Sequence, residues 1–143
     1  MPGKYIGFLC YEGNSKSQSA FDTIRLDQED NVATLTLDRP PHLNSLTQQM
    51  TDELLEAVTQ LRDDNNVRCI VLTGEGDAFG ADADLSQLDG DAGDEPVIRQ
   101  LASTLHEVIL QLYYADKPVV TGVNGTAAGA GFSLAGSVGI LLN

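Results

Sequence analysis

The chain has 143 residues, of which 42% are hydrophobic, so its size and composition suit one ordinary domain with an apolar core. Its 21 acidic and 8 basic residues give a formal net charge of −13, which repels phosphate groups and argues against a nucleic-acid or anionic-membrane partner. The low lysine content and the excess of aspartate over glutamate favour a halophilic source, in which high salt screens this self-repulsion.

Residues 1–20 differ from the rest of the chain, because their second part, residues 12–20, is polar and precedes the first segment with clear strand character. We expect a flexible N-terminal extension here and one domain over residues 21–143. The apolar run 5–11 is short and interrupted by Gly7, which predicts no signal peptide. Cys10 and Cys69 lack the paired spacing of a metal or redox site. We therefore expect a cytoplasmic protein with reduced thiols, no bound metal and no membrane span, with Cys69 in the core.

The first half of the domain reads as a hairpin followed by a helix. Residues 21–26 and 32–37 have strand character, and the polar segment 27–31 between them predicts a turn. After a loop over residues 38–44, Ser45 and Gln48 form a capping-box pattern. Apolar residues then recur at helical spacing, so we expect a helix over residues 46–63 with one buried face. That face consists of Met50, Leu54, Leu55, Val58 and Leu61.

The second half alternates strands and helices. Residues 69–73 and 118–123 are short apolar runs typical of buried strands. Between them, an acidic segment with Asp94 as helix cap precedes a helix whose apolar face we expect to be core. That face consists of Val97, Leu101, Leu105, Val108, Ile109 and Leu112. Residues 132–142 read as a helix that passes into further apolar structure. The alternation places the chain in the α/β class.

Two loops rich in glycine and alanine follow the two buried strands, at residues 76–85 and 124–135. Small residues allow backbone N–H groups to approach a ligand oxygen closely. Two such loops directed at one point would form an oxyanion hole, which is a pair of amide donors for a negatively charged oxygen.

Four ordered motifs resemble those of the enoyl-CoA hydratase/isomerase, or crotonase, superfamily over roughly residues 21–136. The segment 32–46 resembles the family's strand and its signature of Arg39, Pro40, Asn44 and Leu46. Residues 70–79 resemble its next strand, and residues 81–85 its first oxyanion segment. Residues 118–125 and 128–131 resemble its second oxyanion loop. The resemblance implies a crotonase-like ββα spiral, of the ClpP/crotonase type, that is incomplete at its C-terminus.

The resemblance also implies a ligand and a site. The backbone N–H groups of Ala83 and Ala130 would hold the thioester oxygen of an acyl-CoA during hydration or double-bond isomerisation in fatty-acyl catabolism (β-oxidation). Coenzyme A is then part of the substrate, and no separate cofactor is expected. The positions expected to border the acyl and pantetheine path are Ala81, Asp84, Leu85, Ser86 and Gly129.

Three departures from the family pattern bear on activity. Asp82 stands where the family has glycine, and a positive φ there would strain aspartate and reshape the hole slightly. Ser133 replaces the first catalytic glutamate of the hydratases, and serine is no carboxylate base. The second family carboxylate lies about twenty residues beyond Ser133, past the end of this chain. We therefore expect a member of a lyase or isomerase family that lacks its general base. For this chain, the homotrimer or hexamer typical of the family is doubtful.

Other readings of the same residues remain open. The chain could be a non-catalytic remnant or an interaction module, or a serine hydrolase that uses Ser133 with His42 or His106. The acidic run around Asp89, Asp91 and Asp94 lacks the spacing of an EF-hand and reads as a solvated loop. The glycine loop at 125–131 is followed by neither the Lys-Ser/Thr of a phosphate-binding loop nor an acidic residue at the ribose-binding offset of a dinucleotide fold.

Overall fold

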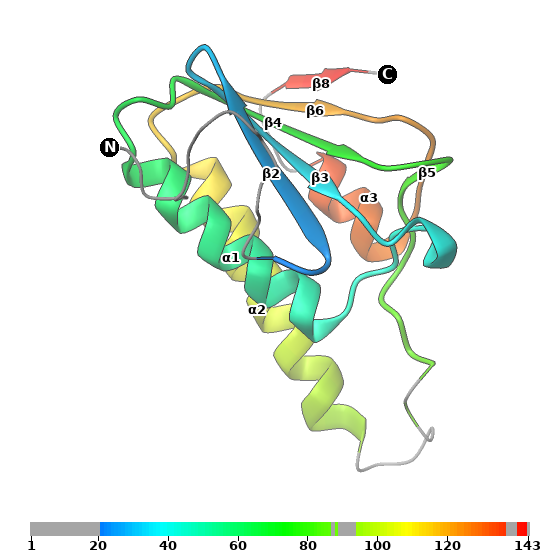
Figure 1. Cartoon of the computed structure of the whole chain (residues 1–143). Coiled ribbons are helices and arrows are strands. Elements are labelled where there is room, and N and C mark those ends of the chain that lie inside the picture. Colours follow the sequence, from blue (N-terminus) through cyan, green and yellow to red (C-terminus); the bar gives the residue numbers. More distant parts are fainter. Residues whose placement is uncertain (1–20, 87, 89–93, 137–139, 143) are drawn as a thin grey trace.

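A computed structural model of the protein describes residues 21–86, 88, 94–136 and 140–142. The predicted extension over residues 1–20, Cys10 and the acidic positions Asp89 and Asp91 lie outside the described residues. The main sheet has five strands in the order β2-β3-β4-β6-β8. Helices α1 and α2 pack against each other and lie beneath this sheet in Figure 1, so the fold has a sheet layer and a helix layer.

The predicted hairpin is confirmed. Strands β2 (Ile24–Glu29) and β3 (Val32–Leu37) pair antiparallel. The turn is shorter than the sequence suggested, because only Asp30 and Asn31 separate the strands. Both have positive φ, at 53° and 72°, the conformation that two-residue type I′ turns require.

The remaining strands of the main sheet run parallel to β3. They are β4 (Cys69–Gly74), β6 (Val119–Gly122) and β8 (Ile140–Leu142). Strands β4 and β6 correspond to the predicted runs within one residue at each end. Cys69 is only half-buried, so the expectation that it lies in the core is wrong.

Helix α1 (Gln48–Asp63) covers the sheet with the predicted face. Met50, Leu54, Val58 and Leu61 are fully buried, while Leu55 packs at the edge of the core. The predicted N-cap is wrong, because Thr47 and not Ser45 precedes the first turn of α1. The Thr47 side chain accepts a hydrogen bond from the Met50 N–H at 3.1 Å. The C-terminal end is capped by Lys117, whose Nζ donates to the carbonyls of Leu61 and Asp64.

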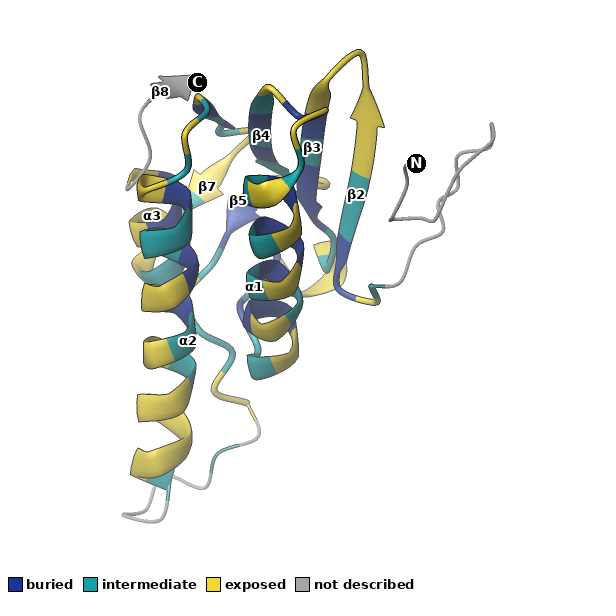
Figure 2. Cartoon of the chain, turned by 90° about the vertical axis from the view of Figure 1, so that its left-hand side faces the viewer, coloured by how far each residue is buried: buried dark blue, intermediate teal, exposed yellow. Residues whose placement is uncertain are grey.

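Helix α2 (Glu95–Tyr113) is only partly a core element. Leu105, Val108 and Leu112 are buried against α1 and the sheet, but Val97 is 51% exposed, which contradicts the expectation that its whole apolar face is core. The N-terminal half projects beyond the end of α1 in Figure 1, and exposed residues dominate it in Figure 2. Asp94 stands at the N-cap, yet its side chain makes no capping hydrogen bond.

A second, two-stranded sheet and a short helix follow the ends of the main strands. Strand β5 (Ala78–Gly80) comes after β4, and strand β7 (Thr126–Ala127) comes after β6. The two pair in parallel. Helix α3 (Gly129–Gly136) begins three residues earlier than the sequence suggested and ends before β8. A short 3₁₀ turn, η2 (Pro40–His42), joins β3 to the segment before α1. None of the described helices is both long and apolar enough to cross a bilayer.

Candidate functional site

The two glycine-rich loops lie side by side, as the sequence predicted. The register of β5 and β7 places Ala78 opposite Thr126 and Gly80 opposite Ala127. Main-chain atoms meet directly where the loops cross, since a Cβ added to Gly131 would lie 2.0 Å from the Gly80 carbonyl oxygen. Any side chain at Gly131 would therefore collide with backbone that has no room to move.

Two asparagines anchor the first glycine loop. Asn44 is fully buried, and its Nδ2 donates to the carbonyl of Ala78 at 2.8 Å and to that of Phe79 at 3.3 Å. Its φ of 56° is left-handed, a conformation that asparagine tolerates better than most residues. From the second loop, Asn124 Nδ2 donates to the same Ala78 carbonyl at 3.1 Å, and its Oδ1 accepts from Gly74 N–H at 3.1 Å. The segment before α1 and the second glycine loop are thus both anchored to the Ala78 carbonyl of the first glycine loop.

Arg39 connects the loop before α1 to the first glycine loop. Its Nη1 donates to the carbonyl of Ser45 at 2.7 Å and also reaches the Ser45 hydroxyl. Its Nη2 forms an ion pair with Asp84 at 3.1 Å, in which the two side chains are 17% and 15% exposed. Hydrogen bonds from the Ser86 hydroxyl and N–H, with a smaller contribution from Arg39, hold the pKa of Asp84 at about 2.

Backbone pairing fixes the direction of the Ala83 amide. Leu46 and Ala83 form a parallel bridge, in which Leu46 N–H donates to the Asp82 carbonyl and Asp84 N–H donates to the Leu46 carbonyl. Because N–H groups alternate in direction along an extended segment, the Ala83 N–H points away from Leu46. The Ala130 N–H is free of helical pairing for another reason: it lies in the first turn of α3.

These two amides converge on one oxygen atom. Ala83 N–H donates to Asp82 Oδ1 at 2.7 Å, and Ala130 N–H donates to the same atom at 3.0 Å. The two hydrogen bonds, first from Ala130 and then from Ala83, lower the pKa of Asp82 below its ordinary value. The family-like motifs pair Ala83 with Ala130 and mark Asp82 as a departure, but they do not indicate that the Asp82 side chain accepts from both.

The expected backbone strain at Asp82 is absent. Positive φ among the described non-glycine residues occurs at Asp30, Asn31, Leu43 and Asn44, so Asp82 has an ordinary φ. The left-handed residue at this junction is Gly129, whose φ is 52°. A Cβ on Gly129 would lie 2.1 Å from the Asp82 Cγ, so the missing side chain leaves the room that the carboxylate fills. Asp82 therefore acts on the site through its side chain and not through its backbone.

The other predicted contact residues surround this junction to different degrees. Ala81 is half-buried and donates its N–H to the Leu43 carbonyl at 3.0 Å. Asp84 is held by Arg39, Leu85 is 52% exposed, and Ser86 is exposed with its N–H bonded to Asp84 Oδ1. Sequence reasoning missed the positioning roles of Arg39, Asn44 and Asn124. The only sequence signal for these three residues was their position within the motifs that resemble those of the family.

The residues named in the alternative readings lie at the surface. His42, His106 and Ser133 are exposed on η2, α2 and α3 respectively. Within the part of the chain that the structure describes, no cluster of three His, Cys, Asp or Glu side chains could hold a metal ion.

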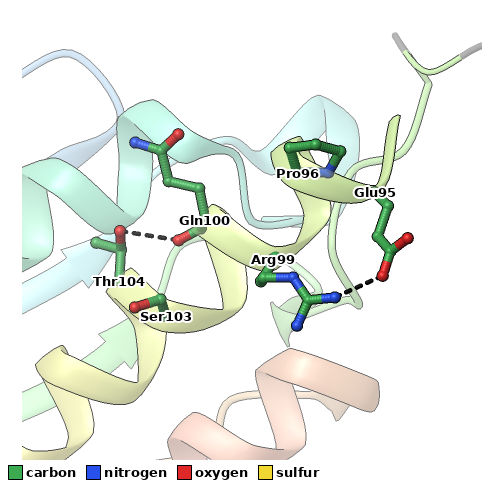
Figure 3. Close-up of a pocket in the computed structure, with 6 residues that line it drawn as sticks. All are labelled: Glu95, Pro96, Arg99, Gln100, Ser103 and Thr104. Carbon is green, nitrogen blue, oxygen red and sulfur yellow. Dashed lines mark hydrogen bonds and ion pairs between the residues drawn. The ribbon is translucent and has the colours of Figure 1, made fainter. Parts of the chain in front are cut away.

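A shallow surface hollow lies along the N-terminal half of α2 (Figure 3). All of its lining residues come from this one helix, and two of its side-chain interactions are internal to α2: the Arg99–Glu95 ion pair and the hydrogen bond from the Thr104 hydroxyl to the Gln100 carbonyl. The full lining is Glu95, Pro96, Arg99, Gln100, Ser103 and Thr104. Because the hollow contains none of the converging amides, we take the junction of the two loops as the candidate site.

Comparison with known proteins identifies the family of the chain. The fold and the paired loops define a crotonase-like α/β protein. The sequence model for "Enoyl-CoA hydratase/isomerase" matches residues 27–140, and the chain belongs to this family.

Relatives with assigned activities cover several reactions of acyl-CoA thioesters. The chain is 39% identical to 1,2-epoxyphenylacetyl-CoA isomerase of Escherichia coli over 75% of this chain and 42% of the relative. It is 37% identical to 4-chlorobenzoyl coenzyme A dehalogenase-2 of an Arthrobacter species, over 78% and 41%. It is 33% identical to crotonyl-CoA hydratase of Syntrophomonas wolfei, over 81% and 44%. The chain thus spans less than half the length of these relatives.

Solved structures show the same fold. An enoyl-CoA hydratase from Bacillus anthracis superposes with a TM-score of 0.78 at 30% identity, over 84% of this chain and 46% of that one. An enoyl-CoA hydratase from Mycobacterium smegmatis gives 0.77 at 31% identity, over 84% and 47%.

Proposed function

We propose that the N–H groups of Ala83 and Ala130 form the oxyanion hole for an acyl-CoA thioester. The observation that carries this proposal is their convergence on a single oxygen atom, at 2.7 and 3.0 Å. Those distances match the range that a developing oxyanion needs from its donors. Family membership supports an acyl-CoA ligand, since several relatives are named for reactions of such thioesters.

The chemistry of thioesters gives this amide pair a clear purpose. Proton transfer or addition next to the thioester carbonyl builds an enolate, and preorganised donors stabilise its oxygen more than the neutral carbonyl. Each donor is expected to lower the barrier by about 3 kcal/mol, as oxyanion-hole deletions in other enzymes indicate. The N-terminal end of α3 adds its partial positive charge at Ala130.

We propose hydration or double-bond isomerisation as the class of reaction, in fatty-acyl catabolism. Ala81, Asp84, Leu85, Ser86 and Gly129 are proposed to border the ligand. Ser133 supplies no carboxylate at the position where hydratases have one, so this chain is expected to bind the thioester without hydrating crotonyl-CoA. Measurable hydration in an enoyl-thioester absorbance assay would show that another group acts as the base. The cytoplasmic location, the halophilic source and the oligomeric state stay predictions.

A pair of ligands tests the oxyanion hole directly. Butyryl-CoA carries the thioester oxygen, whereas the corresponding S-alkyl thioether of coenzyme A lacks it. We expect millimolar butyryl-CoA to shift the amide NMR signals of Ala83 and Ala130, and the thioether to leave them in place.

Two variants control this test. Ala83→Pro removes one donor and should abolish the preference for thioester over thioether, while Ala83→Gly keeps the N–H and should retain it. Equal binding of the two ligands by wild type, by Ala83→Gly and by Asp82→Gly, which lacks the carboxylate that lies between the two amides, would refute the assigned hole.

A further inference from the structure

The oxygen that the two amides share belongs to the protein itself. Asp82 Oδ1 accepts from Ala83 N–H and Ala130 N–H, so both donors of the proposed hole are already engaged. The carboxylate lies directly against Gly129, at a distance that leaves no room for a Cβ there. This fit places an anionic side chain at the position where an external oxygen would have to bind.

The contact favours the internal carboxylate over a neutral ligand. Hydrogen bonds to an ionised oxygen are roughly twice as strong as those to a neutral carbonyl. The carboxylate is also tethered next to the amides, so it competes without the entropy loss that a free ligand suffers. Asp82 is nevertheless exposed, which leaves its side chain free to turn toward solvent.

We propose that the Asp82 carboxylate is a built-in competitor for the oxygen site between Ala83 and Ala130, so that an external oxygen ligand binds only when this side chain turns away. While it occupies the site, the Asp82 carboxylate would weaken the binding of an external carboxylate or thioester oxygen. For the thioester, this inference rests on the proposed function. For a small carboxylate such as acetate it does not, because acetate would take the place of the side chain itself.

The experiment compares wild type with Asp82→Gly and reads the Ala83 and Ala130 amide signals by NMR. Acetate should shift both signals in Asp82→Gly at concentrations that leave wild type unchanged. Butyryl-CoA should bind Asp82→Gly at least about tenfold more tightly than wild type. Asp82→Asn, which preserves the shape of the side chain, should give an intermediate gain and serves as the second variant if the glycine variant folds poorly.

A charge control is necessary because coenzyme A is anionic. Asp77→Asn removes one negative charge from the same loop, at an exposed position, and should change the affinity for butyryl-CoA less than threefold. A gain in Asp77→Asn equal to that in Asp82→Asn would overturn the proposal, because general charge repulsion would then explain it.

The remaining outcomes separate this inference from the proposed function. If acetate shifts the amide signals only in Asp82→Gly but butyryl-CoA binds neither protein, the competition by Asp82 stands and the thioester assignment fails. If butyryl-CoA and acetate bind wild type and Asp82→Gly equally well, the competition by Asp82 is refuted while the oxyanion hole stands.

Discussion

The apolar layer between the sheet and α1 and the junction of the two glycine loops are both close-packed, but different atoms make the contacts. In the apolar layer, side chains such as Leu54, Leu61 and Ile70 are fully buried against one another. In the junction, backbone meets backbone at Gly80 and Gly131, and hydrogen bonds from two asparagines and an arginine fix the loops. A core of side chains can repack after a substitution, whereas contacts between main-chain atoms cannot. The site is thus built from the less adaptable of the two regions.

The largest expected effect is that of Gly131→Ala. Helix propensity alone favours alanine by about 1 kcal/mol, but the added Cβ would lie 2.0 Å from the Gly80 carbonyl oxygen. We expect a loss of about 3 kcal/mol or more in the free energy of unfolding, measured by urea denaturation.

Two controls belong to this experiment. Gly136→Ala, at the end of the same helix, meets no atom of the residues that the structure describes within 4 Å and should cost nothing. In the apolar layer, Leu54→Met should cost less than about 1.5 kcal/mol, because its volume is similar. Equal losses for Gly131→Ala and Leu54→Met would remove the distinction between the two regions.

Asn44→Ala is expected to have the next largest effect. It deletes the donors to the Ala78 and Phe79 carbonyls and places alanine at a φ of 56°. The lost buried hydrogen bonds and the backbone strain should together destabilise the fold by about 3 kcal/mol. Asn44→Gly relieves only the strain and should recover about 1 kcal/mol of this loss. If both variants were as stable as wild type, Asn44 would not hold the junction.

The smallest expected effect is that of Asp84→Asn on the free energy of unfolding, and it depends on pH. Hydrogen bonds from Ser86 and the Arg39 ion pair lower its pKa from 3.8 to about 2, so the folded state favours the charged form. This stabilisation is fully present above the unfolded pKa and is lost as the pH falls from about 4 toward 2. Asp84→Asn should cost about 2 kcal/mol at neutral pH, through loss of charged hydrogen bonds.

The stability difference between wild type and Asp84→Asn should therefore shrink on acidification. Urea denaturation at pH 6, 4 and 3 measures it. A difference that stayed constant over this range would show that the Asp84 charge contributes nothing to the fold, and would weaken the case for Arg39 as an anchor of the first loop.

Local patterns predicted most of the elements, but neither the cap of α1 nor the extent of the buried face of α2. The period-two alternation of residues 32–37 and the helical spacing from Met50 to Leu61 both identified the correct structure. Ser45 was wrong as a cap because α1 begins at Gln48, so that Thr47 is the residue directly before the first turn and accepts from the Met50 N–H. Val97 was wrong as core because the first turns of α2 extend beyond α1, and a helical repeat does not reveal where its neighbour ends.

The sequence by itself determined the kinds of elements, the order of the glycine loops and the family, because strand alternation, helix periodicity and motif spacing are local properties of the chain. It also identified Ala83 and Ala130 as a pair through resemblance. Only the tertiary structure decided which oxygen lies between them. That outcome depends on the pairing of β5 with β7, which brings Asp82 to an amide 48 residues away, and on the space beside Gly129 that lets its carboxylate fit.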